Sequence, residues 1–174
     1  MRPTTTIAGL VGACLALACS PALDWRELRP EGSGIAALFP CKPDRNVRTL
    51  AVAGHHVRME MLACSAAGAT YALAYVDLPD PAAIGPALAE LRGLAAANIG
   101  AAPGDSAALQ VPGMTPHPQA SRVALVGKLP DGAAVQEQAA FFAKGLRVYQ
   151  ASVIGTRLQG DGAQTFLAAL KLTA

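Results

Sequence analysis

The chain has 174 residues, which is enough for one domain and a short additional segment. Apolar residues make up 52% of it, so a substantial core can form, and only 15% of the residues are charged. The formal net charge is +2, and the basic residues are scattered rather than clustered. This pattern argues against nucleic-acid binding through a basic patch, so no nucleic-acid partner is expected.

The N-terminal segment 1–18 has the pattern of a bacterial lipoprotein signal peptide. Arg2 supplies a positive charge, and an uncharged, mostly apolar stretch follows over Thr6–Ala18. This stretch is short for a membrane-spanning helix and fits the apolar core of a signal peptide. The sequence LALAC, which ends at Cys19, resembles a lipobox, in which a cysteine becomes the acylated N-terminus after cleavage. We predict a signal peptide over residues 1–18 and a short tether over residues 19–23.

Alternatives remain open for this segment. An ordinary secretory signal would be cleaved near Ala18 or Ala22 without acylation. Val11–Cys14 forms a second lipobox with a shorter apolar stretch before it, and its use would leave Cys19 as an additional thiol. Ser20 stands where an aspartate usually retains lipoproteins in the inner membrane. The expected location is therefore the cell envelope, on an outer-membrane lipid anchor that faces the periplasm.

Residues 24–174 are predicted to form a single domain that begins with strands. The first strands are expected at Trp25–Arg29, Gly34–Phe39, Val47–Ala53, His56–Cys64 and Thr70–Leu78. Gly54 separates the third of these strands from the fourth and indicates a hairpin between them.

A helix follows this group of strands. Asp80 and Pro81 are typical of a helix start, because aspartate caps free N–H groups and proline needs no partner there. Apolar residues then recur at helical spacing, at Ile84, Leu88, Leu91, Ala95 and Ile99. Because Gly85 and Pro86 interrupt the first turns, we expect the regular helix to begin at Pro86 and to end before Gly100.

The second half repeats this order of strands and helix. Residues 101–119 are rich in proline and small polar residues and are predicted to form a long loop. Strands are expected at Ser121–Gly127, Ala134–Phe142 and Arg147–Ile154, and a closing helix is expected at Asp161–Leu172. Because short hairpin connections dominate, the predicted fold class is α+β, with an antiparallel sheet of about 6–8 strands covered by helices.

Two stretches resemble bacterial secreted domains with the PsbP-like fold. The first is W-x-x-x-x-P-x-G-x-G-I-x-x-L-F-P-x-K-P, over Trp25–Pro43. The second is RVYQASVIG, over Arg147–Gly155, followed by AQTFLAALKL over Ala163–Leu172. The resemblance implies an antiparallel sheet with helices packed on its faces, an α/β sandwich. Its members are mostly binding or assembly proteins and share no catalytic motif, so the resemblance implies no site residue.

The remaining cysteines are predicted to form a disulfide. If Cys14 is removed and Cys19 is acylated, only Cys41 and Cys64 are left in an oxidising compartment. The predicted strand directions place both at the same end of the sheet. With strands in sequential order one strand would separate them by about 9–10 Å, so Cys41 must bend across to within about 7 Å. Two unpaired thiols are the alternative.

The stretch HHVRMEM contains soft metal ligands. His55, His56, Met59 and Met61 are residue types that Cu(I) prefers. On a strand, however, Met59 and Met61 share the face of Val57, which indicates core packing. We interpret the methionines as core residues and keep these four residues only as weak metal candidates.

The sequence shows no nucleophile elbow, phosphate loop or similar catalytic pattern. Asp77 and Asp80 are interpreted as a helix cap and its solvated neighbour rather than as an acidic site. We therefore expect a non-enzymatic, membrane-anchored lipoprotein without a cofactor that binds or helps to assemble an envelope protein. The alternative is a carrier that holds a small apolar ligand between sheet and helix, where the alanine-rich helix leaves room.

Overall fold

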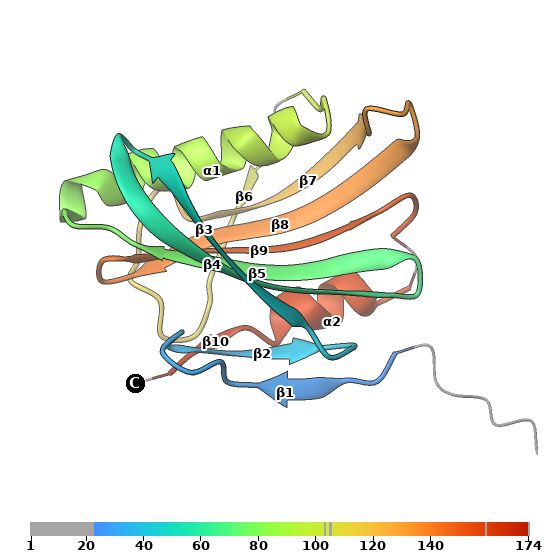
Figure 1. The fold of residues 1–174 in the computed structure, drawn as a ribbon, viewed down its shortest axis with the longest axis horizontal. Coiled ribbons are helices and arrows are strands. Elements are labelled where there is room, and N and C mark those ends of the chain that lie inside the picture. The colour runs from blue at the N-terminus through green and yellow to red at the C-terminus, as the bar shows by residue number, and fades with distance from the viewer. Residues whose placement is uncertain (1–22, 103, 105, 159, 174) are drawn as a thin grey trace, which may run out of the picture.

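The computed structural model describes residues 23–102, 104, 106–158 and 160–173. Within them the chain has the predicted α+β fold, with a seven-stranded antiparallel sheet, a three-stranded antiparallel sheet and two α-helices (Figure 1). The predicted signal peptide and the predicted acylation site Cys19 lie outside the described residues. No helix among the described residues is long and apolar enough to cross a membrane.

The main sheet has the strand order β3-β4-β5-β9-β8-β7-β6. Its strands are β3 (Asp44–Val52), β4 (His55–Ala66), β5 (Ala69–Asp77), β6 (Ser106–Ala108), β7 (Ser121–Lys128), β8 (Ala134–Lys144) and β9 (Arg147–Gly155). Short connections join β3 to β4, β4 to β5, β7 to β8 and β8 to β9, so consecutive strands pair as hairpins. The two hairpin groups meet where β5 pairs with β9.

The small sheet contains β1 (Arg26–Leu28), β2 (Ile35–Phe39) and β10 (Lys171–Leu172), in the order β1-β2-β10. The sequential order assumed from the sequence was therefore wrong, because β2 leaves the main sheet and does not lie beside β3. The closing helix α2 (Gly162–Ala168) is also shorter than predicted. Its expected last residues form β10 instead, since pairing with β2 satisfies their backbone groups.

Helix α1 (Ile84–Asn98) begins earlier than predicted. A short 3₁₀ turn, η1 (Pro81–Ala83), precedes it, and the Asp80 carboxylate accepts a hydrogen bond from the Ala82 N–H at 2.8 Å. Pro86 lies in the first turn of α1, where its missing N–H removes no helical hydrogen bond. The predicted cap at Asp80 is thus confirmed, whereas the predicted helix start at Pro86 was wrong.

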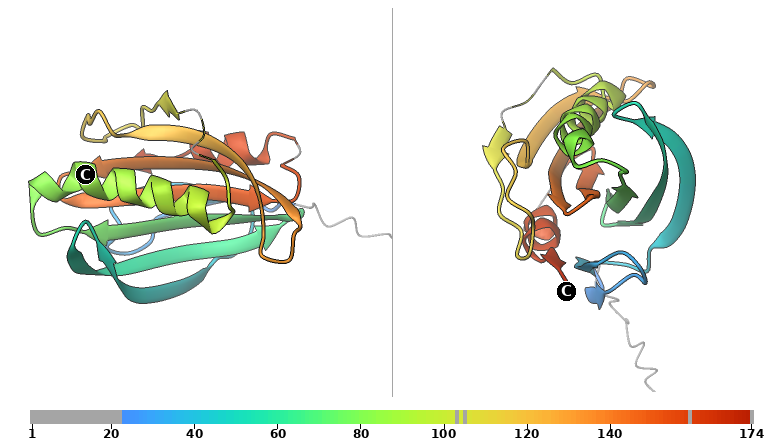
Figure 2. Two further views of the ribbon diagram at one scale, coloured as in Figure 1. Left: turned by 90° about the horizontal axis from the view of Figure 1, so that it is seen from above. Right: turned by 90° about the vertical axis from the view of Figure 1, so that its left-hand side faces the viewer.

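The main sheet is a central layer that is covered on both faces (Figure 1, Figure 2). We call the face packed against α1 the helix face, and the face packed against α2 and the small sheet the small-sheet face. Successive residues of β5 show the alternation, because Tyr75 belongs to the small-sheet face and Val76 to the helix face. Each face therefore has its own hydrophobic cluster.

Strand β4 differs from its prediction because both faces of the main sheet are covered. Val57 is buried in the cluster under α1, as expected, but Met59, which packs against that cluster, and Met61 on the same face are only partly buried. On the opposite face Leu62 is 7% exposed and packs with the small-sheet cluster. The single core face inferred from the sequence was wrong, because this strand buries residues on both sides.

The predicted loop before β7 contains one short strand. Residues of β6 pair with the start of β7, from Ser106 opposite Val123 to Ala108 opposite Ser121. Three residues without apolar alternation give no strand signal in the sequence, and only their pairing with β7 makes them a strand. The other end of the main sheet is β3, which is three times as long, with nine residues against three.

Candidate functional site

Cys41 and Cys64 form a disulfide, as predicted, with a Cα–Cα distance of 6.0 Å. Cys41 follows β2 of the small sheet, and Cys64 lies in β4 of the main sheet. The strand that was expected to separate the two cysteines does not lie between them, because β2 belongs to the small sheet and not to the main sheet. The bond therefore connects the two sheets on the small-sheet face.

A cleft of about 610 Å³ lies beside this covering layer, on the same side of β4 and β5 as the small sheet. Its polar side chains come from four strands of the main sheet, and the turn that precedes β2 forms the opposite wall. The residues that define its chemistry are Arg45, Arg58, Glu60, Tyr75, Asp77 and Arg147.

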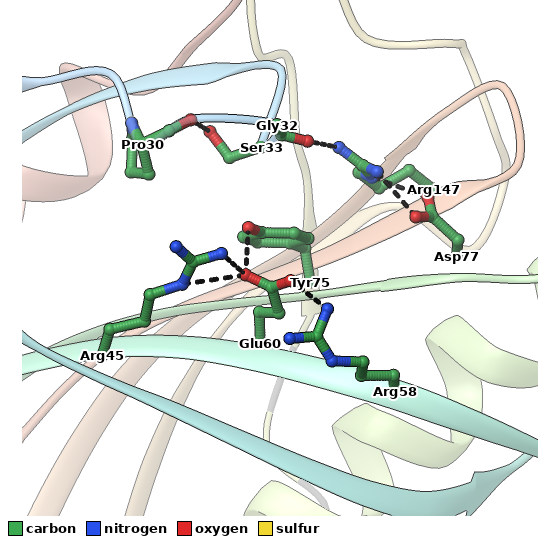
Figure 3. A network of polar contacts seen from close by, with 9 residues as sticks. All are labelled: Pro30, Gly32, Ser33, Arg45, Arg58, Glu60, Tyr75, Asp77 and Arg147. Atoms are coloured by element: carbon green, nitrogen blue, oxygen red, sulfur yellow. Dashed lines mark hydrogen bonds and ion pairs between the residues drawn. The ribbon is translucent and has the colours of Figure 1, made fainter.

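Glu60 lies at the centre of this group, and its side chain is only 12% exposed. Its Oε2 accepts hydrogen bonds from the Arg45 guanidinium, with Nε at 3.1 Å, and from the Tyr75 hydroxyl at 2.8 Å. Its Oε1 accepts a hydrogen bond from Arg58 Nη1 at 2.9 Å. Figure 3 shows Glu60 between the two arginines. Two cations and one phenol thus compensate one largely buried carboxylate.

The strand register produces this cluster. Glu60 of β4 lies directly opposite Tyr75 of β5, and Val47 of β3 lies opposite Glu60 on the other side. Arg45 is two residues from Val47, and Arg58 is two residues from Glu60, so all of them share one face of the sheet. A one-residue slip of β4 would move Glu60 to the helix face and dissolve the cluster.

The protonation states of the cluster are fixed by its contacts. Hydrogen bonds from Arg45 and then from Tyr75 lower the pKa of Glu60 below its usual value. Burial, together with the hydrogen bond to Glu60, raises the pKa of Tyr75 to about 12. At neutral pH the carboxylate is therefore charged and the phenol protonated. Such a cluster recognises charged groups rather than exchanging protons near neutral pH.

Arg147 connects the cleft floor to its opposite wall. Its Nε and Nη2 donate to the two carboxylate oxygens of Asp77, each at 2.6 Å, and Nη1 donates to the Gly32 carbonyl. Its guanidinium carbon lies 5.0 Å from the centroid of the Tyr75 ring, within cation–π range. Tyr149 adds a hydrogen bond from its hydroxyl to the Ser33 carbonyl at 2.8 Å. The turn that forms the wall is therefore held to the main sheet by side chains.

The predicted metal candidates do not come together. His56 lines the cleft, whereas His55, Met59 and Met61 alternate to the helix face of β4. Along a strand His55 and Met59 are separated by about 13 Å, at about 3.3 Å per residue. Within the described residues no group of three or more histidine, cysteine, aspartate or glutamate side chains could hold a metal ion.

A smaller pocket of about 260 Å³ lies between α1 and β7. Its walls include Arg92 and Ala96 of the helix and Val123 and Leu125 of the strand. This is the position, between sheet and helix, where the sequence suggested room for a small apolar ligand.

Strand β3 provides the third candidate surface. Its residues Asp44–Thr49 are all exposed, although they lie within a strand. Within the described residues β3 pairs only with β4, so the backbone groups on its outer side have no strand partner. Arg45 belongs to both this edge and the cleft, so the two surfaces adjoin.

Sequence reasoning missed the Glu60 cluster and the β3 edge. Arg58 and Glu60 alternate with the apolar residues of HHVRMEM, but this alternation alone does not indicate a buried carboxylate. Only the register with β3 and β5 brings Arg45 and Tyr75 to Glu60.

No protein-family model matches the chain, and a search of curated proteins finds no match either.

Proposed function

We propose that the protein is a non-enzymatic lipoprotein of the bacterial cell envelope that binds, or helps to assemble, another envelope protein. In this proposal Cys19 carries the lipid anchor, in the outer membrane and facing the periplasm, and residues 24–174 form the binding domain. The LALAC sequence and the PsbP-like pattern support the anchor and the class of protein. The free edge of β3 is the observation that carries the binding role.

An unpaired strand edge is a template for another strand. Each residue along β3 carries a backbone donor and acceptor, and those on the outer side can hydrogen-bond an extended segment of a partner. At about 3.3 Å per residue, nine residues offer an edge of roughly 30 Å. Natural sheets usually shorten or cover such edges, as this sheet does at its other end with the three-residue β6.

The charges on β3 favour a specific partner over self-association. Arg45 and Arg48 project to opposite faces of the strand, and in a parallel, in-register pairing of two copies each would lie beside the same arginine of the other copy. A partner strand without this repulsion pairs more favourably. This repulsion disfavours the in-register pairing of two copies of β3 and leaves the edge available to a different chain.

Site-specific photo-crosslinking in living cells tests this binding role. A photoreactive residue at Val47, which is 43% exposed on β3, is compared with one at Val126, which is 72% exposed on β7. We expect a discrete adduct with one envelope protein from position 47 and none from position 126. Equal adducts from both positions, or none from position 47, would contradict the proposal.

The anchor is tested separately. Cys19→Ser should abolish labelling by a palmitate analogue and release the protein from the membrane fraction, whereas Cys14→Ser should change neither. If Cys14→Ser has these effects and Cys19→Ser does not, the acylated residue is Cys14. If the unchanged protein is not labelled by the palmitate analogue, the lipoprotein assignment is refuted.

A second candidate function is the carriage of a small apolar ligand, which the pocket between α1 and β7 favours. Native mass spectrometry of protein purified from its own host should then show a bound molecule. Ala96→Met, which places a longer side chain at the pocket wall, should reduce its retention. A clean mass of the free protein would argue against this function.

A further inference from the structure

We infer that the cleft beside β4 and β5 binds a small molecule through an oxyanion group, a carboxylate or a phosphate, held by Arg45 and Arg58. This site shares Arg45 with the protein-binding edge in the proposed function, but it does not depend on that function. Three features of the cleft support it: unused hydrogen-bond donors, a local excess of positive charge, and side chains fixed in place before a ligand arrives.

The donors are counted from the contacts of the two arginines. A guanidinium has five N–H donors. Arg45 directs Nε and Nη2 to Glu60, and Arg58 directs Nη1 to Glu60. Within the described residues, Nη1 of Arg45 and Nε and Nη2 of Arg58 have no hydrogen-bond partner. The two side chains are 53% and 64% exposed, so these donors reach the open cleft.

The local charge favours an anion. Arg45 and Arg58 together carry two positive charges, and Glu60 compensates only one of them. Arg147 is neutralised by its two hydrogen bonds with Asp77 and contributes no further net charge. One positive charge therefore remains between β3 and β4, at the point where the unused donors lie.

Glu31 limits the kind of anion that fits. It lies in the turn on the opposite wall, and no salt bridge pairs it within the described residues. Its carboxylate repels a ligand that carries negative charge along its whole length. The cleft therefore favours a ligand with an oxyanion group at the arginine end and a neutral or cationic group toward Glu31.

The arginines are already held in position. Glu60, which the Tyr75 hydroxyl holds in place, fixes the inner sides of both guanidinium groups, and Arg147 fixes the wall through the Gly32 carbonyl. Long side chains normally lose conformational freedom when they bind a ligand, and here part of that loss has occurred on folding. This preorganisation distinguishes the pair from two isolated arginines on a surface.

Side-chain NMR tests the inference. The Nε–Hε signals of the arginines are followed while acetate or inorganic phosphate is added at constant ionic strength. We expect saturable shifts for Arg45 and Arg58 and none for Arg48, which lies on the other face of β3, opposite Met59. Saturation by acetate alone identifies a carboxylate site, by phosphate alone a phosphate site, and by both a general oxyanion site.

Matched variants give the direction of each effect. Arg58→Gln should weaken binding about tenfold, the loss of one charge-assisted contact, and leaves the contacts of Arg45 and Tyr75 with Glu60 in place. Glu31→Gln should strengthen binding because it removes the repelling carboxylate, and Arg48→Gln should change nothing. Shifts that do not saturate with either anion, or equal affinities for Arg58→Gln and the unchanged protein, would overturn the inference.

Discussion

The two faces of the main sheet are built from different chemistry. The helix face packs small and aliphatic residues against α1, and among the described residues Phe141 is the only aromatic side chain in its buried cluster. The small-sheet face buries six aromatic side chains: Phe39, Tyr71, Tyr75, Phe142, Tyr149 and Phe166. The disulfide and the hydrogen bond from Arg147 to the Gly32 carbonyl also lie on that side.

The difference shows where binding surfaces can form in this fold. A long helix such as α1 can lie along a sheet face and cover its middle, because its small side chains allow the helix to pack close to the strands. The small sheet and the seven-residue α2 cover less of their face and need aromatic, ionic and covalent contacts to stay in place. The uncovered remainder of that face becomes the cleft, and the free edge of β3 adjoins it.

The largest effect is expected at the contact that holds α2. Phe166 is fully buried, and its ring packs edge-on against Phe39 at 5.1 Å and Tyr71 at 5.6 Å between centroids. Because α2 is too short to be stable alone, Phe166→Ala should lower the free energy of unfolding by about 3–5 kcal/mol.

Urea unfolding followed by fluorescence measures this change, since Trp25 is the only tryptophan and packs 6.0 Å from the Tyr71 ring. Leu94→Ala is the control, because Leu94 lies on α1 and is 43% exposed. A loss for Phe166→Ala no larger than that of the control would mean that α2 does not depend on this packing.

The disulfide is the next contact of the small-sheet face. It closes a loop of 23 residues in the unfolded chain, and the loop-entropy relation gives about 3 kcal/mol for this length. The double substitution Cys41→Ser and Cys64→Ser should therefore lower the free energy of unfolding by about 3 kcal/mol. Unchanged urea midpoints for the double variant and for the reduced protein would show that the covering layer is held without the bond.

A pH effect is expected on the helix face. Glu137 lies two residues from both Val135 and Ala139 of that face and opposite Leu125 and Ile154. Burial raises the pKa of Glu137 from 4.5 to about 7. The folded protein thus holds a proton that the unfolded chain releases. Stability should fall as the pH rises from about 4.5 to about 7, by up to about 3 kcal/mol.

Glu137→Gln tests this dependence, because the amide has the same shape and does not titrate. The variant should match the unchanged protein near pH 4.5 and exceed its melting temperature at pH 8. If both proteins show the same dependence on pH, another group is responsible.

The smallest effects come from two glycines near α1. A Cβ at Gly127 would lie 2.0 Å from the Ile99 carbonyl oxygen, which also accepts a hydrogen bond from the Lys128 N–H at 2.7 Å. Gly127→Ala should therefore cost about 1–3 kcal/mol. A Cβ at Gly93 meets nothing within 4 Å, and Gly93→Ala should stabilise the helix by about 0.5–1 kcal/mol. A lower melting temperature for Gly127→Ala and a higher one for Gly93→Ala would confirm that the end of α1 lies close against β7.

The sequence was most informative where its signal is local. The capped start near Asp80, the hairpin at Gly54 and the main strands follow from turn chemistry and from the spacing of apolar residues. The α+β class followed from these elements, and the Cys41–Cys64 disulfide followed from the cysteines left after Cys14 and Cys19. Both are present in the structure.

Long-range pairing was the part that local signals could not provide. Nothing between residues 34 and 39 indicates that β2 pairs with β10 rather than with β3, because both partners are compatible with its apolar residues. The burial of Glu60 likewise depends on the register of three strands. The cleft was missed because its residues are far apart in sequence and meet only through that register.

Amide hydrogen exchange of β3, resolved by residue with NMR, tests most directly whether this edge is free. In an antiparallel edge strand, alternate N–H groups point away from the sheet. We expect alternate residues of β3 to exchange rapidly, whereas β5, which pairs on both sides, is protected throughout. Protection of every residue along β3 in the isolated protein would show that its edge is covered and would contradict the proposed binding role.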